Sequence, residues 1–382
     1  MISPMAHYLE DPFLRRLYDD IRAAGPLRAA QIDITHVCNL RCSGCYFFSE
    51  NLDRFKAPDE ETFDAFIEQE KARGTNHFTV VGGEPSLMLG RLKKMYDNFS
   101  MVVVTNGIRR IPYEGFEDMA IAVSVWGDHE TDTRLRGNGK IDVFAKGLKN
   151  YKDDQRAAWY YTTTPGNAHE IESVVEQCVQ NGNYVSFNFY GDISGLGGAV
   201  DHRRGFGKVC REIDRMIERY PDRILLTSYV AQVVATGDLY GDKWGHEVCC
   251  TLTYDHEKNF ERLKNGKPYN PHLRVYNPDL KTTRRCCAGD DRDCANCYEC
   301  WAHFSWIILN LEKHLGSKQE FTNWLTTMYL FYLSNRIIDF DEGVKLVPEI
   351  HSRLSYLRDQ NRLELPTENR QAALEYIVLE AL

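Results

Sequence analysis

Apolar and polar positions follow two different periods along the chain up to residue 222. Short apolar runs with alternating sides predict strands, and segments with apolar residues three and four positions apart predict helices. Strands are expected at residues 29–37, 77–81, 101–105, 120–126, 157–164 and 184–190. Helices are expected at residues 59–73, 87–96, 143–151, 168–180 and 202–220, after a helical lead-in over residues 1–28.

This alternation predicts an α/β fold in which helices cover a parallel sheet. A partial (β/α)6 TIM-like barrel and a doubly wound sheet both agree with the pattern. In either fold, chemistry is expected at the carboxyl ends of the strands. The unusual residues follow strands in this way: a group of cysteines, a Gly-Gly-Glu-Pro segment, Asn106-Gly107 and Trp126-Gly127-Asp128.

The pattern changes after residue 222. Residues 223–300 are rich in Asp, Asn, Gly, Pro, Tyr and Cys, so this Cys-rich loop region is expected to need a cross-link. Residues 301–382 form a predicted C-terminal helical extension, with helices at residues 306–315, 320–338, 346–360 and 368–379. These helices are expected to pack on the barrel of residues 29–222. The alternatives are that they cap its mouth over a large or apolar substrate, or form a dimer interface.

Composition and charge exclude several classes of protein. The chain has 382 residues, of which 43% are hydrophobic, so it can form a proper core. Its formal net charge is −9, which argues against duplex DNA or an anionic membrane as partner and leaves a local RNA-binding patch open. No apolar run is long enough to span a membrane. The first residues lack a signal-peptide pattern, so a cytoplasmic location is expected.

The cysteines are the residues that most clearly indicate a chemical function. The chain has 12 cysteines, and in a cytosolic protein such clustering favours metal binding over disulfides. Cys38, Cys42 and Cys45 directly follow the first predicted strand. Three thiolates on a 4Fe–4S cluster leave one iron open for chemistry. Structural zinc, or a cluster with a fourth ligand from elsewhere, are alternatives that the spacing leaves open.

The sequence resembles the radical S-adenosylmethionine enzymes. Their Cx3Cx2C motif, in the loop after the first strand of a partial (β/α)6 barrel, matches Cys38, Cys42 and Cys45. Their glycine-rich segment at the end of the second strand, which receives the amino group of the cofactor, matches Gly82, Gly83, Glu84 and Pro85. Asn106 and Ser124 stand at the ends of the third and fourth strands, where family members contact the cofactor.

The resemblance covers residues 29–200, about half of the chain, and implies a mechanism. A 4Fe–4S cluster with an open iron binds S-adenosylmethionine, and one electron from a donor such as flavodoxin or ferredoxin generates a 5′-deoxyadenosyl radical. Asn188 and other polar strand residues, Asp33, Tyr160, Thr162 and Tyr190, are expected near the cofactor or substrate. Gly44 stands where many members have an aromatic residue that packs on adenine, so Tyr46 or Phe47 is expected to replace it.

A second group of cysteines lies beyond the predicted barrel. It resembles the auxiliary-cluster extensions called SPASM or twitch domains, although its spacing differs from the SPASM pattern. The expected ligands of a second 4Fe–4S cluster are Cys287, Cys294, Cys297 and Cys300, and Cys249 or Cys250 is an alternative for one of them. A zinc site and a set of disulfides are the other interpretations.

Cys249 and Cys250 also carry a catalytic hypothesis. The second region has more thiols than one cluster needs, so one of these two is a candidate hydrogen-atom donor in an epimerisation. Cys178 and Cys210 lie on predicted helices, where they are expected to be packing residues.

The expected function is therefore radical modification of a small molecule, with a sugar-containing natural product as the first guess and redox, epimerisation or C–C chemistry as the outcome. A lead-in too short for a fused peptide-recognition domain argues mildly against a peptide substrate. Peptide maturation and a non-catalytic iron–sulfur or zinc protein are the two alternatives.

Overall fold

The computed structural model describes residues 4–190, 206–245, 247–267, 270–286, 294, 297 and 299–361; of residues 300 and 355–361 it describes the backbone. Cys287, the side chain of Cys300 and the helix expected at residues 368–379 lie outside the described residues.

A parallel sheet organises the described chain. Its seven strands lie in the order β6-β5-β4-β3-β2-β1-β9, and all neighbours run parallel. The strands are β1 (Ala29–Asp33), β2 (His77–Val81), β3 (Ser100–Thr105), β4 (Ala120–Val125), β5 (Ala157–Thr163), β6 (Tyr184–Phe189) and β9 (Val275–Tyr276). A separate antiparallel pair joins β7 (Asp238–Leu239) to β8 (Asp242–Lys243).

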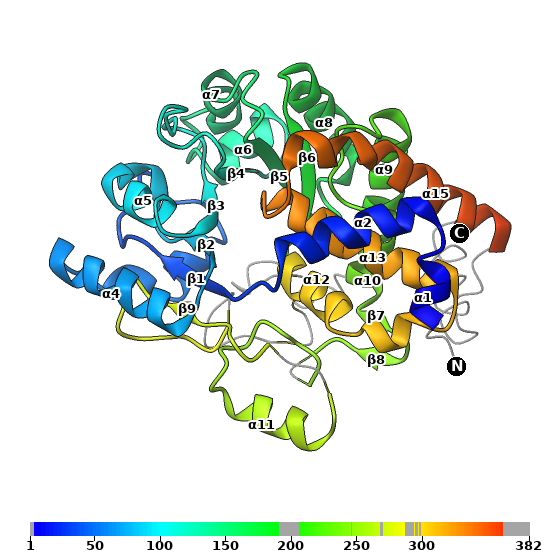
Figure 1. The fold of residues 1–382 in the computed structure, drawn as a ribbon. Coiled ribbons are helices and arrows are strands. Elements are labelled where there is room, and N and C mark those ends of the chain that lie inside the picture. The colour runs from blue at the N-terminus through cyan, green and yellow to red at the C-terminus, as the bar shows by residue number, and fades with distance from the viewer. Residues whose placement is uncertain are drawn as a thin grey trace.

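Helices cover the outer face of this curved sheet, as Figure 1 shows for α4, α5, α7 and α8. Up to β6 the helices are α1 (Pro4–Tyr8), α2 (Pro12–Ala24), α3 (Tyr46–Ser49), α4 (Glu60–Arg73), α5 (Leu89–Tyr96), α6 (His129–Leu135), α7 (Val143–Asn150) and α8 (Ile171–Gln180). Those that follow are α9 (Phe206–Arg219), α10 (Ser228–Thr236), α11 (Glu257–Lys264), α12 (Cys300–Ile308), α13 (Lys318–Ser334), α14 (Phe340–Gly343) and α15 (Val347–Asn361).

Alternation along the strands separates the core from the site. Val123 and Trp159 are fully buried in the main hydrophobic core, whereas the neighbouring residues Ser124 and Tyr160 face the inside of the curved sheet and line a cavity. The register places Ser124 beside Tyr160, and it places Thr162 beside Asn188. The partial barrel that the sequence predicted is confirmed, and its inner face carries polar and aromatic side chains.

The C-terminal helices hold the N-terminal ones. Tyr332 donates a hydrogen bond to the carbonyl of Gly25 at 3.2 Å, and Tyr329 donates to Asp20 at 3.3 Å. Asp11 caps α2 and pairs with Lys318 and Arg353. Figure 1 shows α2 lying beside α13 in consequence. The predicted helical extension therefore packs on the rest of the fold.

Some elements differ from the sequence-based expectation. Strand β9 comes from the Cys-rich region and has only two residues, too few to show a period. Helix α12 begins at Cys300, earlier than the expected start at Trp306, because Glu299 caps it by accepting from the N–H of Ala302. The chain continues in a separate short turn of helix over Leu311–His314.

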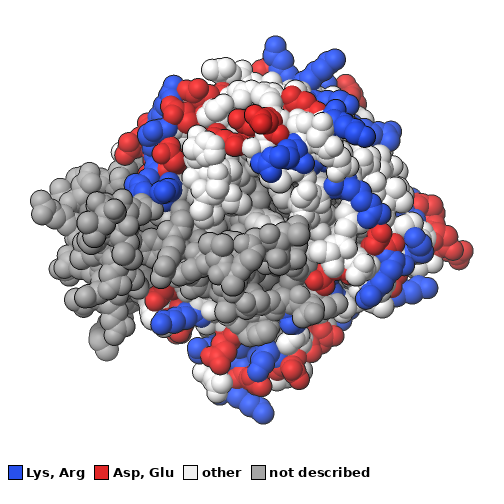
Figure 2. Space-filling view, turned by 180° about the vertical axis from the view of Figure 1, so that it is seen from behind, with Lys and Arg blue, Asp and Glu red and all other residues white. Residues whose placement is uncertain are grey.

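The surface and the helices give no sign of a membrane span. In the part of the chain that the structure describes, no helix combines the length and apolar character needed to cross a bilayer. Figure 2 shows Lys and Arg side chains interspersed with Asp and Glu around the visible face, with uncharged residues toward its middle.

Candidate functional site

The carboxyl ends of the strands open into a cavity of about 540 Å³. Ten of the residues predicted for the first cluster and the cofactor line it: Cys38, Cys42, Cys45, Tyr46, Gly82, Gly83, Glu84, Asn106, Ser124 and Asn188. Pro85 is buried next to this lining. The parallel sheet thus brings segments that are far apart in the sequence to one place.

The cysteine loop lies against the Gly-Gly segment. The N–H of Gly83 donates to the carbonyl of Thr35 at 3.0 Å, and the N–H of Glu84 donates to the carbonyl of Val37 at 2.9 Å. A Cβ atom at Gly83 would lie 2.1 Å from that Val37 oxygen. Glycine is therefore required here because the two backbones touch, and this contact fixes the start of the cysteine loop.

Glu84 joins the ends of β2 and β3. One carboxylate oxygen accepts from the N–H of Ser86 at 3.0 Å and from the hydroxyl of Thr105 at 2.6 Å. The other accepts from the N–H of Asn106 at 2.9 Å. The side chain is buried, so these three donors compensate the cost of placing a carboxylate there. The structure gives Glu84 a clamping role, and direct contact with a cofactor amino group stays a prediction.

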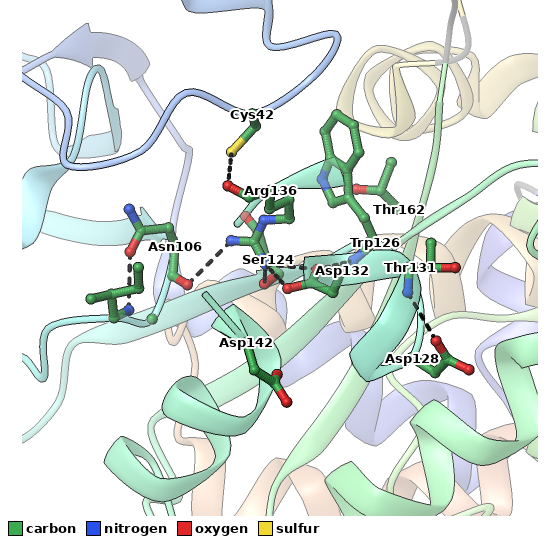
Figure 3. A network of polar contacts seen from close by, with 12 residues as sticks. Cys42, Asn106, Ser124, Trp126, Asp128, Thr131, Asp132, Arg136, Asp142 and Thr162 are labelled. Atoms are coloured by element: carbon green, nitrogen blue, oxygen red, sulfur yellow. Dashed lines mark hydrogen bonds and ion pairs between the residues drawn. The ribbon is translucent and has the colours of Figure 1, made fainter. Parts of the chain in front are cut away.

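Arg136 connects the ends of neighbouring strands through hydrogen bonds (Figure 3). Its guanidinium donates to the carbonyl of Ser124 at 2.6 Å and to the carbonyl of Asn106 at 3.2 Å, and it pairs with Asp132 at 3.1 Å. The thiol of Cys42 donates to the carbonyl of Arg136 at 4.0 Å. One buried arginine therefore connects β3, β4 and the cysteine loop.

Arg136 is not among the site residues that the sequence predicts. The signal that identifies it is tertiary: a guanidinium 2% exposed at the strand ends, with an aspartate one helical turn earlier.

The Tyr46 side chain contacts a buried ion pair between Asp33 and Arg284. Its hydroxyl donates to Asp33 at 3.3 Å, and Asp33 forms an ion pair with Arg284 in which neither side chain is exposed. The Arg284 guanidinium lies 5.9 Å from the Tyr46 ring centroid. Adenine packing by Tyr46 stays a prediction, whereas Phe47 is 1% exposed and does not line the cavity.

The second cysteine region reaches the same cavity at one point. Cys297 lines it, and Cys294 accepts from Arg285 at 4.0 Å. Burial raises the pKa of Cys297 well above its usual range, and the negative charges of Cys249 and Cys286 raise it further. These three thiols are therefore close enough to interact, although Cys249 is far from the other two in the sequence.

The catalytic hypothesis for Cys249 and Cys250 finds no support in this geometry. Both side chains are buried, and neither lines the described cavity. Cys250 donates to the carbonyl of Val248 at 3.1 Å. Burial raises the pKa of Cys249 to about 12, with Cys286 adding to the effect. A hydrogen-donor role for either thiol stays a prediction.

Comparison with known proteins gives partial matches. No family model matches the chain. The sporulation killing factor maturation protein SkfB of Bacillus subtilis strain 168 is 26% identical over 170 residues, which cover 40% of this chain and 40% of SkfB. The match thus spans two-fifths of the length of that relative.

In its Cx3Cx2C loop and its Gly-Gly-Glu-Pro segment, this chain resembles the radical S-adenosylmethionine enzymes. Among solved structures, native anSMEcpe with bound AdoMet is 15% identical, covers 78% of this chain and 84% of its own, and has a TM-score of 0.48. Streptococcus suis SuiB bound to precursor peptide SuiA is 14% identical, covers 54% and 50%, and has a TM-score of 0.38.

Cys38, Cys42 and Cys45 suit a cluster that is held by three thiolates. Burial, together with smaller contributions from the charges of Glu84, Cys42 and Cys45, raises the pKa of Cys38 to about 12, so the thiols are near one another. Arg136 partly offsets burial at Cys42, whose pKa is raised to about 11. Bound iron would supply the positive charge that makes thiolates stable here. None of the three is in a disulfide.

Asn188 suits a bound ligand. Its Oδ1 is buried in the cavity wall and has no hydrogen-bond partner among the described residues. Buried polar atoms are almost always paired in proteins, so this acceptor is placed for a donor from a cofactor or substrate.

Proposed function

We propose that this protein binds a 4Fe–4S cluster on Cys38, Cys42 and Cys45, together with S-adenosylmethionine, and removes a hydrogen atom from a substrate in the same cavity. When bound, this pair would supply reductive cleavage of the sulfonium C–S bond, giving methionine and a 5′-deoxyadenosyl radical. The observation that carries the proposal is the attachment of the cysteine loop to the Gly-Gly-Glu-Pro segment at the strand ends.

The chain's own residues bind, orient and exclude water. Thr35 and Val37 fix the cysteine loop through the backbone of Gly83 and Glu84. Asn106 holds the loop a second time, because its side-chain amide donates to Asn39 at 2.7 Å. Helices α12 and α13 supply the apolar wall of the cavity, which keeps water away from a reactive species. An electron donor of the flavodoxin or ferredoxin type completes the proposal.

A second 4Fe–4S site is proposed in the Cys-rich region. The predicted ligand Cys297 supports it, and the structure adds Cys249 and Cys286 as neighbours of that thiol. Cys294 lies near Arg285, whose charge would favour a thiolate. Cys287 and Cys300 remain predicted members of the ligand set.

The substrate proposal has two candidates. A small molecule agrees with the size of the cavity, because sites for single small ligands usually measure about 300–1,000 Å³. A peptide is favoured by the match to SkfB, which is a maturation protein. Either substrate must present a reacting group that is small enough to enter the cavity beside the cofactor.

The cysteine loop can be tested by one substitution. In Cys42→Ala, anaerobic protein with dithionite and S-adenosylmethionine should form at least about 100-fold less 5′-deoxyadenosine, since a cubane site with two thiolates loses iron. Cys178→Ala is the matched control, because that thiol is buried on α8 outside the cavity. Equal deoxyadenosine from Cys42→Ala and wild type would contradict the proposed function.

A further inference from the structure

One side of the cavity is aromatic and is not used by the cofactor residues. Tyr160 of β5 and Trp301 of α12 have ring centroids 6.2 Å apart and planes 12° apart. Phe331 of α13 stands edge-on to Trp301, with a centroid distance of 5.2 Å and planes at 76°. Trp126 and Tyr190, which follow β4 and β6, form a second pair with centroids 5.5 Å apart.

These five rings are called here the aromatic wall. All five line the cavity, and all are only half-buried although they lie inside the fold. Rings of this size are normally buried against other side chains when they lie in a core. Their remaining exposed surface is therefore the surface that a ligand would cover. Ile308, Leu309 and Met328 continue the wall with further apolar atoms.

Charged groups in the described lining already have protein partners. Glu84 accepts three hydrogen bonds, and Arg136 pairs with Asp132. Glu299 accepts from the N–H of Ala302 at the start of α12. A charged group of a substrate would leave water without gaining a counter-charge from these residues, which is costly.

A sugar ring would find few hydrogen-bond partners at the aromatic wall. Each hydroxyl needs a hydrogen-bond partner once it is buried. The α12 and α13 side of the cavity offers mainly hydrocarbon and ring atoms, with the hydroxyls of Ser305 and of Tyr332, and the Tyr332 hydroxyl already donates to the Gly25 carbonyl. An aromatic ring of a substrate would bind more favourably, because edge-to-face and offset contacts with other rings contribute binding energy beyond that of burying its surface area.

We propose that the aromatic wall receives an uncharged aromatic ring of the substrate and places it beside the cofactor. This inference rests on the proposed function, and it replaces the sugar-containing substrate that the sequence suggested. Trp301, Tyr160 and Phe331 are then specificity-determining residues. The ring belongs either to an aryl small molecule or to an aromatic side chain of a peptide.

The test uses the anaerobically reconstituted protein with S-adenosylmethionine and four neutral probes. Indole represents a free aryl group, N-acetyltryptophanamide a peptide-borne one, cyclohexylmethanol an aliphatic group, and methyl glucoside a sugar. Equilibrium dialysis should show binding of indole with at least about fivefold preference over cyclohexylmethanol. Tighter binding of N-acetyltryptophanamide than of indole would assign the ring to a peptide, and the reverse would assign it to a small molecule.

Trp301→Leu should weaken indole binding about tenfold, because the largest ring of the wall is removed. Phe331→Leu, a second variant in case the first folds poorly, should weaken it about threefold. Tyr113→Leu is the control, since that exposed tyrosine lies outside the cavity. Equal affinity for methyl glucoside and indole, or unchanged binding by both wall variants, would overturn the inference.

Deoxyadenosine formation without any probe separates this inference from the proposed function. If wild type cleaves S-adenosylmethionine but does not bind indole, only the aromatic wall proposal fails. If indole binds and no deoxyadenosine forms, the proposed function fails.

Discussion

The two cysteine regions are attached to the sheet in different ways. The first is held by backbone hydrogen bonds on both of its sides: Gly83 and Glu84, after β2, hold its start, and the N–H of Ser43 donates to the carbonyl of Leu135, the last residue of α6, at 2.7 Å. Among its described residues, the second is held by the two-residue strand β9 and by the buried pair of Arg284 with Asp33. The first is thus a loop that is fixed to a strand end and to α6, and the second adds a short strand at the β1 edge of the sheet.

The two kinds of attachment predict which substitutions would disrupt each region. The close backbone contacts of the first region leave no room for an added atom, so a steric clash should disrupt this region. The second region includes one fully buried ion pair, so removal of either charge should disrupt it electrostatically. The pair also joins the two regions, because Asp33 binds Tyr46, next to Cys45, while Arg284 closely precedes Cys286 in the chain.

The largest effect is expected from Gly83→Ala. Its Cβ would meet the Val37 oxygen at 2.1 Å, and a backbone atom cannot turn aside as a flexible side chain can. The cost should exceed the ~1–3 kcal/mol usual for overpacking, and the first cluster should be lost. Iron analysis checks this, with Gly90→Ala as control because that glycine has open space around it. Full iron in Gly83→Ala would refute the steric account.

Arg284→Met should have the next largest effect. It leaves the buried Asp33 carboxylate without its counter-charge, which costs about 3–5 kcal/mol in comparable cases. The double variant Asp33→Asn with Arg284→Met should recover part of that loss, because no charge is then buried. Urea unfolding measures both. A double variant no more stable than Arg284→Met would show that the ion pair does not hold this region.

The smallest effect lies outside both regions, at Asp11. Although burial opposes it, hydrogen bonds from Lys318, the Phe13 backbone and Arg353 lower the pKa of Asp11 to about 2. A carboxyl with a lowered folded-state pKa stabilises above its unfolded pKa, and this is lost as pH falls from about 4 to about 2. Because solvent screens part of the interaction, Asp11→Asn should cost about 1 kcal/mol at pH 6, as urea unfolding would show.

At pH 2 that difference between wild type and Asp11→Asn should have largely disappeared. Iron content at pH 6 should be unchanged in Asp11→Asn, which separates general stability from the two cysteine regions. A loss of iron in this variant would mean that the regions are not independent of the terminal helices.

Much of the first site could be predicted from sequence, because its motifs are local and the alternating pattern places each at a strand end. Cys38, Gly83 and Asn106 reach one cavity for that reason. Arg136 could not be assigned, since its role comes from burial among three segments. The aromatic wall joins Tyr160 to Trp301, which are distant in the sequence, and no local pattern encodes such a pairing.

The second region was harder to predict for a physical reason. Its strand β9 is too short to have a period, and the proximity of Cys249, Cys286 and Cys297 depends on loop folding rather than on spacing. The expected ligand set therefore included Cys297 and, as an alternative, Cys249, but it left out Cys286.

The central claim is that the first cysteine region carries one cluster and the second region another. The direct measurement is anaerobic iron and sulfide content of wild type beside the Cys38/Cys42/Cys45→Ala triple variant, with deoxyadenosine assayed under dithionite. The account predicts about eight irons falling to about four, with deoxyadenosine lost. Wild-type protein that binds no iron and forms no deoxyadenosine would contradict it.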